Sequence, residues 1–273
     1  MKVKEADARA ITVNARSNLA FTRLCLPKGR RKDMESFYAF CRVVDDIADE
    51  PGFTFDQRMD MLGEWKEGLV NGFYEPNLLQ NEIVNLKEKY NILPELFIEI
   101  IKGMEMDVCG TEYETFDDLK GYCYRVASVV GLICLKIFDA NDPKSKNYAV
   151  NLGYALQLTN IIRDVGEDYK NGRVYIPSED LESHDLSKED LISSANSCDF
   201  INLMKLLADR AEYHFKEAEM NICEEDYVSL KAARCMGRIY YLILKKIRKG
   251  GYKVFEKRYR ISGLRKIMVL LGY

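Results

Sequence analysis

Residues 152–177 of this 273-residue chain read LGYALQLTNIIRDVGEDYKNGRVYIP. Leu, Ile, Ala and Val recur at helical spacing through the first half and cover most faces of the predicted helix. A narrow polar stripe interrupts them at intervals of three or four residues, at Gln157, Asn160, Asp164 and Asp168. A solvated helix face would carry Lys and Glu between the apolar residues, not amides and aspartates. The stretch therefore predicts a largely buried helix that presents acidic and amide groups to a site.

A second helix carries the same pattern. Residues 37–50 read FYAFCRVVDDIADE, in which Asp45 and Asp49 share one helix face and Arg42 and Tyr38 continue it. Like charges at this spacing destabilise a helix, and partial burial increases that cost. A divalent cation reverses the sign of this energy, and Mg²⁺ prefers carboxylate oxygens and shares its ligands with substrate phosphates. Two such stripes facing each other across a cavity predict a site that binds a diphosphate through Mg²⁺.

Composition excludes several other classes of protein. The formal net charge of −3 argues against a nucleic-acid partner, and two His are too few for most zinc or di-iron sites. The eight Cys form no CxxC pair, which indicates reduced thiols in the cytoplasm. The first residues lack the apolar segment of a signal peptide, and no run approaches the roughly 18 apolar residues of a membrane span. We expect a cytoplasmic protein without an obligate protein partner.

Apolar periodicity and the six prolines divide the chain into helices, with no strand alternation and no linker. Thr54 and Thr115 are expected N-caps, and Pro94 and Pro143 are expected in first turns. The expected helices span 4–25, 32–50, 54–71, 77–91, 94–107, 116–138, 143–168, 187–195, 199–222 and 224–249, followed by a short C-terminal helix. We therefore expect one all-α domain over residues 1–273, with 116–138 and 143–168 at its centre.

The last residues, 261–273, combine Arg265 and Lys266 with a run of apolar side chains. This pattern fits a short helix on a membrane surface or a terminal helix packed on the core. The modest length favours packing on the core, so any contact with a membrane surface is expected to be peripheral and transient.

With these stripes in place, the chain resembles the squalene/phytoene synthase family, the trans-prenyltransferases that join two prenyl diphosphates head to head. YAFCRVVDDIAD at 38–49 and the stretch 152–177 carry the resemblance, supported by GMEMD at 103–107, GYCYRVASVVG at 121–131 and Arg238-Ile239-Tyr240. The resemblance spans about residues 16–260. It implies an all-α isoprenoid-synthase bundle around a central cavity, with Mg²⁺ as cofactor and prenyl diphosphates as substrates.

The resemblance also implies roles for single residues. The implied Mg²⁺ ligands are Asp45, Asp49, Asn160, Asp164 and Asp168. Contacts with substrate and diphosphate are implied for Arg42, Gln157, Arg173, Asn18 or Ser17, and Lys257 or Arg258. The reacting centre would be lined by Tyr38, Tyr122, Tyr175 and Tyr240, because aromatic faces stabilise cations without trapping them. Two departures stand out: a Ser-rich segment of the family reads RSNLAF at 16–21, and Lys257 cannot make the fork of an arginine.

The chemistry implied by the resemblance starts when one diphosphate leaves and the double bond of the second chain attacks the resulting cation. A cyclopropane diphosphate forms, and a second ionisation leads to a linear product. Hydride from NADPH would give squalene, water would give hydroxysqualene, and proton loss would give dehydrosqualene or phytoene, so NADPH stays undecided. The DDIAD and FYAFCR forms favour two farnesyl diphosphates and a C30 product. Two geranylgeranyl diphosphates giving phytoene are the alternative.

Other functions fit the residues less well. Chain-elongating enzymes on this fold carry DDxxD motifs, whereas both pairs here are spaced as DxxxD. A metal-dependent phosphohydrolase or a di-iron bundle would need more His than the chain has. A helical scaffold without catalysis leaves the amide and carboxylate stripes unexplained.

Overall fold

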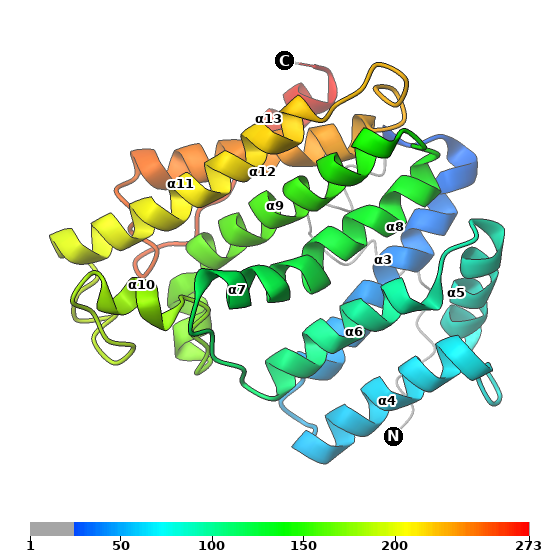
Figure 1. Cartoon of the computed structure of the whole chain (residues 1–273), viewed down its shortest axis with the longest axis horizontal. Coiled ribbons are helices and arrows are strands. Elements are labelled where there is room, and N and C mark those ends of the chain that lie inside the picture. The colour runs from blue at the N-terminus through cyan, green and yellow to red at the C-terminus, as the bar shows by residue number, and fades with distance from the viewer. Residues whose placement is uncertain (1–24, 273) are drawn as a thin grey trace. The chain divides into compact units, whose positions relative to one another are not determined.

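The computed structural model describes residues 25–272, which are all-α and contain no strand, as the sequence predicts (Figure 1). The elements are α3 (Lys28–Asp49), α4 (Phe55–Asn71), α5 (Leu78–Lys89), α6 (Pro94–Val108), α7 (Phe116–Cys123), η2 (Tyr124–Ser128), α8 (Val129–Phe138), α9 (Pro143–Lys170), α10 (Ser178–Glu182), α11 (Cys198–Met220), α12 (Lys231–Lys249) and α13 (Gly263–Leu270). The expected helix 4–25 and Asn18 lie outside the described residues.

Contacts within the chain divide it into two compact units. The first unit contains the described part of Met1–Thr111 together with Val129–Lys146 and Cys223–Met236. The second unit contains Glu112–Ser128, Asn147–Ile222 and Gly237–Tyr273. That the whole chain forms one domain around a central cavity stays a prediction.

The first unit is organised around α3, which packs against α4, α5, α6 and α8. Aromatic side chains form its centre, with the Phe40 ring 5.2 Å from Trp65 and 5.3 Å from Phe97 between centroids. Phe37 and Phe40 are completely buried and mark the inner face of α3. Because a helix face that packs is apolar, the polar residues of this helix gather on its other side.

Helix starts follow the sequence signals. Thr54 and Thr115 each accept a hydrogen bond from the backbone three residues later and complete a capping box. Pro94 opens α6 and Pro143 opens α9. The first turn of α9 is held by the buried Asp226 carboxylate, which accepts hydrogen bonds from Asp142 N at 2.8 Å and the Ser145 hydroxyl at 2.7 Å. These caps satisfy N–H and O–H groups that the helix itself leaves open.

The expected helix 116–138 is continuous but contains a π-helical turn at Tyr124–Ser128. By length and composition, Phe116–Phe138 could cross a membrane, whereas the sequence was expected to contain no segment of that kind. Half of its most apolar window is buried within the protein, and α8 packs against α3 and α6. A core position accounts for the same composition, since buried helices are apolar on most faces.

In the second unit, α9 lies against the π-helical turn. The Ser128 hydroxyl donates to the Val150 carbonyl at 2.8 Å. A side-chain carbon at Gly153 would lie 2.5 Å from the Ser128 nitrogen, so only glycine permits this approach. The glycine in LGYAL therefore sets how closely α9 and the turn pack.

The structure corrects three expected elements. Residues 187–195 form turns and not a helix, although Ser187 and Asp190 make the reciprocal contacts of a helix start, with Asp190 N 3.2 Å from Ser187 Oγ. Helix α12 begins at Lys231 and not at 224, since the preceding Asp226 caps α9. The segment after Pro177, which lies outside the expected helices, forms the short helix α10.

The C-terminal helix is buried on one side only. Val269 is the buried residue of α13, whereas Leu264 and Ile267 are exposed. This helix therefore leaves an apolar face in solvent.

Candidate active site

The first aspartate pair lies on the last turns of α3. Asp45 is partly buried and Asp49 is exposed, four residues apart as predicted. Arg42 reaches both Asp45, with Nη1 2.7 Å from Oδ2, and Asp46, with Nη2 2.5 Å from Oδ1. Tyr38 lies two turns from Asp45 on the same helix and is half-buried. The predicted stripe is thus present, and Arg42 already binds anionic oxygens in it.

Excess negative charge gathers around Asp45. Partial burial raises the pKa of Asp45 to about 6, and the charge of Asp49 adds to the rise. Arg42 opposes the shift, whereas Asp46 and Asp107 increase it. Asp107 comes from the last turn of α6, so two helices contribute carboxylates to this part of the first unit. A cation would relieve this repulsion, which makes the donor set suitable for Mg²⁺.

Sequence reasoning did not assign Asp107 a role. Its segment, GMEMD, was part of the resemblance, but a single aspartate on an amphipathic helix gives no periodic signal. Only the packing of α6 against α3 brings it within electrostatic reach of Asp45.

The second aspartate pair lies near the end of α9 in the second unit. The Asp164 side chain is only 13% exposed and is held by two arginines. Arg163 donates from Nε to Oδ1 at 2.9 Å and from Nη2 to Oδ2 at 2.5 Å. Arg258 donates to Oδ2 at 2.9 Å and also contacts Glu167 at 2.7 Å. The Arg258 guanidinium therefore reaches the second motif, and contact of Lys257 or Arg258 with a substrate stays a prediction.

The two basic residues differ in their contacts within the protein. The Lys257 ammonium lies 5.1 Å from the centre of the Tyr259 ring, and the residue is exposed. Arg258 alone of the two makes an ion pair with the motif in the described residues.

Arg163 is a further residue that the sequence pattern missed. Burial disfavours its charge, but its hydrogen bonds and ion pair with Asp164 raise the pKa of the guanidinium, helped by a hydrogen bond with Tyr240. The predicted Tyr240 thus joins this motif through Arg163. Neighbouring residues in a helix point in different directions, so a periodic argument passes over Arg163.

The amides of the stripe contain an unsatisfied acceptor. Asn160 donates from Nδ2 to Gln157 Oε1 at 3.4 Å. Its own Oδ1 is buried and has no hydrogen-bond partner among residues 25–272. Buried polar atoms are normally paired, so an orphaned oxygen one turn before Asp164 indicates a ligand. An amide oxygen beside a carboxylate fits a hard cation such as Mg²⁺.

A pocket in the second unit brings together three predicted site residues. Asp168, Arg173 and Tyr175 line it, with apolar walls that include Ile161 and Leu191. The Tyr175 ring also belongs to a cluster of tyrosine rings and lies 5.2 Å from Tyr122 and 6.2 Å from Tyr113 between ring centres. Tyr122 and Tyr113 are buried. Tyr113 was not predicted, because it lies before its helix and outside the quoted motifs.

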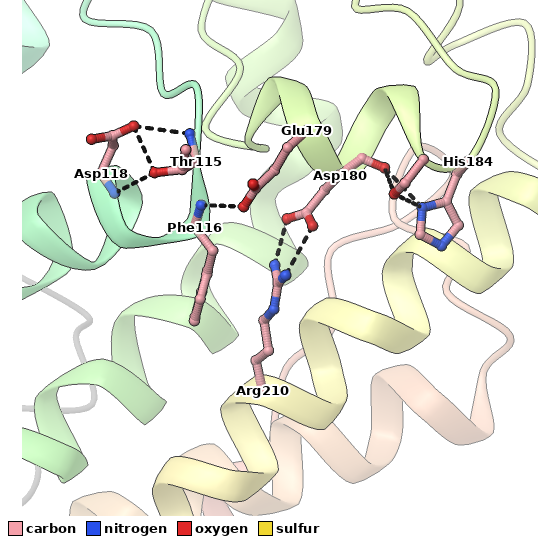
Figure 2. Close-up of polar contacts among 8 residues, drawn as sticks. Thr115, Phe116, Asp118, Glu179, Asp180, His184 and Arg210 are labelled. Atoms are coloured by element: carbon pink, nitrogen blue, oxygen red, sulfur yellow. Dashed lines mark hydrogen bonds and ion pairs between the residues drawn. The ribbon is translucent and has the colours of Figure 1, made fainter.

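The segment 171–177, which carries Arg173 and Tyr175, is anchored at both ends. At its start, Gly172 has a φ of +76° and the Arg173 N–H bonds the Asp168 carbonyl at 2.9 Å. At its end, α10 is fixed to α7 and α11, as Figure 2 shows. Glu179 accepts from the Phe116 N–H at 2.6 Å.

The anchor at α10 depends most on a buried ion pair. Both oxygens of Asp180 accept from the Arg210 guanidinium, one of them from Nη2 at 2.9 Å (Figure 2). The guanidinium also lies 4.0 Å from the centre of the Phe116 ring. This contact set joins α7, α10 and α11 and fixes where the tyrosine-bearing segment ends.

Among the described residues, three possible metal ligands converge at Asp142, Cys223 and Glu225 and not at the aspartate pairs. Asp142 accepts from the Lys144 N–H at 2.7 Å, and its own N–H bonds the buried Asp226. These contacts are those of a helix start, so helix capping accounts for this acidic group.

The chain is similar to known proteins over most of its length. The model of the squalene/phytoene synthase family matches residues 12–265. Phytoene synthase 1, chloroplastic, of Arabidopsis thaliana is 36% identical over 91% of this chain and 60% of its own length. The chain thus spans about three fifths of that relative. The 15-cis-phytoene synthase of Synechocystis sp. is 30% identical over 96% of this chain and 82% of its own length.

Solved structures show the same fold. A dehydrosqualene synthase in complex with ligand has a TM-score of 0.80 and 29% identity, with 97% of this chain and 93% of that chain covered. The squalene synthase HpnC from Alicyclobacillus acidocaldarius has a TM-score of 0.77 and 27% identity over 90% of this chain and 93% of its own. The family match covers nearly the whole chain, and it includes both aspartate pairs. This chain belongs to the squalene/phytoene synthase family.

Proposed function

We propose that this chain is a Mg²⁺-dependent prenyltransferase that condenses two prenyl diphosphates head to head. Family membership supports the reaction type. The site assignment rests on Asn160 Oδ1, which is buried without a hydrogen-bond partner in the described residues, one helical turn before Asp164. A cation bound by this motif would satisfy that oxygen. Asp45, Asp49, Asn160, Asp164 and Asp168 would hold Mg²⁺, and Asp107 adds negative charge at the first pair.

The proposed substrate is geranylgeranyl diphosphate, and the proposed product is phytoene. The motif forms alone favoured two farnesyl diphosphates. The plant and cyanobacterial relatives, however, are named phytoene synthases, and they share 30–36% of their residues with this chain. Farnesyl diphosphate remains the second candidate, because the similar structures are of dehydrosqualene and squalene synthases at 27–29% identity.

In this mechanism, bound Mg²⁺ would neutralise a diphosphate and improve it as a leaving group. Arg42 and Arg258 would exchange their present carboxylate partners for diphosphate oxygens, which suit the arginine fork. Charge on Arg163 would remain compensated by Asp164 and Tyr240. Gln157 and Arg173 would orient the substrate.

The tyrosines would act on the carbocation left by diphosphate. Aromatic faces attract cations by about 0.5–2 kcal/mol per contact. Tyr122 and Tyr175 are stacked in one cluster with Tyr113, and Tyr38 and Tyr240 would contribute from their own helices. The double bond of the second substrate attacks the cation, a proton leaves, and a cyclopropane closes. Proton loss also ends the second stage in a phytoene synthase, so the proposed reaction consumes no NADPH.

The cellular setting is proposed with the activity. We expect action in the cytoplasm on prenyl diphosphates as the only required partners. The Arabidopsis relative is named chloroplastic.

The purified protein should be incubated with Mg²⁺ and either geranylgeranyl or farnesyl diphosphate, with and without NADPH, and the extract analysed by mass spectrometry. A C40 product from geranylgeranyl diphosphate without NADPH is expected. A C30 product alone would select the second candidate, and no condensation with either substrate would refute the proposal.

Variants test the site itself. Asp45→Ala and Asp164→Ala should abolish turnover while helix content measured by circular dichroism is retained. Asp60→Ala, an exposed aspartate on α4, is the matched control and should keep full activity. Product formation by either motif variant would overturn the assignment of that pair.

A further inference from the structure

Two cysteines that are far apart in the sequence meet in the first unit. The Sγ atoms of Cys25 and Cys235 lie 3.7 Å apart, although 210 positions separate the two residues. Both belong to the first unit, with Cys25 shortly before α3 and Cys235 in the second turn of α12. None of the eight cysteines, which all lie in the described residues, forms a disulfide in the structure. The two thiols are therefore in direct contact but not bonded.

Packing on both sides holds these thiols in place. Next to Cys25, Leu26 is 4% exposed, and its carbonyl accepts a hydrogen bond from Arg31 Nε at 2.8 Å. On α12, Met236 is buried beside Cys235. An S–S bond is about 2.05 Å long, so the two sulfur atoms must approach each other by about 1.7 Å to form one.

The two thiols differ in their access to solvent. Cys25 is half-buried, whereas Cys235 is only 7% exposed, so a reagent in solution reaches Cys25 first. The hydrogen bond with Cys235 and partial burial raise the pKa of the Cys25 thiol, and the charge of Lys231 opposes the rise. Because the thiolate is the reacting form, Cys25 should react slowly at neutral pH.

We propose that Cys25 and Cys235 are a site of reversible covalent modification, at which a low-molecular-weight disulfide such as oxidised glutathione generates an intramolecular disulfide bond. The bond would join the segment before α3 to α12 within the first unit. The proposal goes beyond the condensation reaction and does not rest on it.

The chemistry takes place in two exchange steps. The Cys25 thiolate attacks one sulfur atom of oxidised glutathione, one glutathione thiolate leaves, and a mixed disulfide forms on Cys25. The Cys235 thiolate then attacks the Cys25 sulfur atom and expels the second glutathione thiolate. The protein loses two protons and two electrons in total, and the small disulfide is reduced to two thiols.

The exposed cysteines Cys109 and Cys198 provide a comparison within the same chain. Neither has a second thiol in hydrogen-bond contact in the described part of the chain, so each should stop at a mixed disulfide with glutathione. The second step at Cys25 is intramolecular, and its two sulfur atoms are already adjacent. The internal bond should therefore form at a lower ratio of oxidised to reduced glutathione than the mixed disulfides do.

Peptide mass spectrometry tests the proposal directly. The full chain should be equilibrated at mildly alkaline pH with glutathione buffers of increasing oxidised-to-reduced ratio, and the remaining thiols should then be alkylated. Trypsin cleaves after Lys and Arg and releases Cys25 in LCLPK (24–28) and Cys235 in CMGR (235–238). We expect these two peptides to be recovered as one linked species, which dithiothreitol separates.

Variants assign the order of the two steps. Cys235→Ser should accumulate the mixed disulfide between Cys25 and glutathione, because no second thiol displaces it. Cys25→Ser should leave the buried Cys235 without glutathione. Cys109→Ser/Cys198→Ser removes the two exposed thiols and is the matched control, which should form the internal bond as the unmodified chain does.

The bond should also change stability. It would close a loop of 210 residues and so restrict the unfolded chain, which should raise the melting temperature by roughly 5–10 °C. Dithiothreitol should reverse the rise, and Cys25→Ser should show none. A fall in melting temperature on oxidation would show that the bond distorts the native packing, and it would overturn the proposal.

Two results of the peptide experiment would also overturn the proposal. One is the absence of the linked peptides at every ratio that modifies Cys109 and Cys198. The other is the joining of Cys25 to several different cysteines in similar yield, which is the result expected of an unfolded chain and not of two thiols in native contact.

Discussion

Replacing Arg210 by Met should destabilise the second unit through one buried carboxylate. The Asp180 side chain is 4% exposed and accepts both of its strong hydrogen bonds from the Arg210 guanidinium. Met keeps most of the side-chain volume and its contact with Phe116, but it removes every donor. Asp180 is then left charged in the interior, which is the costly way to break a buried pair.

The magnitude follows from burial. Removing one partner of a buried pair costs about 3–5 kcal/mol. Arg210 is 22% exposed, so water can partly reach the site, and the lower value of about 3 kcal/mol is expected. For a chain of this size, that corresponds to a fall in melting temperature of roughly 6–12 °C.

Arg248→Met is the matched control. Arg248 is 25% exposed, similar to Arg210, but its partners Asp209 and Glu212 are 55% and 28% exposed. Pairs of exposed groups contribute about 0–1 kcal/mol, so its melting temperature should change little. The double variant Asp180→Leu/Arg210→Met should recover much of the lost stability, since no charge remains buried.

Thermal denaturation by circular dichroism measures these shifts, and hydrogen exchange locates them. Loss of the anchor should speed exchange of the Arg173 N–H, because the segment 171–177 loses its attachment at α10. Equal destabilisation by Arg210→Met and Arg248→Met, or a double variant no more stable than Arg210→Met, would refute the reasoning.

Three more predictions concern pH and packing. The pKa of Asp45 is about 6 in the folded protein and 3.8 in the unfolded chain, so its carboxyl group destabilises the fold increasingly as pH rises from 3.8 to 6. In the absence of metal, Asp45→Asn should therefore raise the melting temperature above pH 6 but not at pH 3.8. An equal effect at both pH values would contradict this prediction. Burial and the charge of Lys120 lower the pKa of His214 from 6.5 to about 4. The stability that its neutral form contributes is therefore complete above pH 6.5 and is lost as pH falls toward 4. His214→Gln should reduce the slope of melting temperature against pH between pH 4 and 6.5, and an unchanged slope would count against this prediction. Gly153→Ala should lower the free energy of unfolding by about 1–3 kcal/mol, because the added methyl group would overpack against Ser128. Gly63→Ala in α4, where space is open, should raise it by about 0.5–1 kcal/mol. Similar denaturation midpoints for the two variants would disprove the packing argument.

Local sequence patterns predicted most helices because caps and periodicity act within a few residues. The capping box at Thr54 and the N-terminal positions of Pro94 and Pro143 are examples. The errors lie where a side chain serves another element. Asp226 caps α9 and delays its own helix, and α10 exists between anchors on α7 and α11.

Some residues of the candidate site could likewise be predicted from local sequence patterns, and others could not. The stripes of Asp45 and Asp49, and of Asn160, Asp164 and Asp168, could be found from spacing, since a helix repeats its faces at fixed intervals. Asp107, Tyr113 and Arg163 could not, because each joins the site through packing or a long side chain and not through a repeat.

The sequence by itself determined that the chain is helical, that two helices carry acidic stripes, and that its motifs resemble those of the family to which it belongs. These are properties of short segments, where propensity and periodicity suffice. Only the tertiary structure decided that Arg258 and not Lys257 meets Asp164, that Asn160 keeps an oxygen without a partner, and that α13 turns its leucines to solvent. Each of these depends on which surfaces are buried together, and burial is set by contacts between segments distant in the chain.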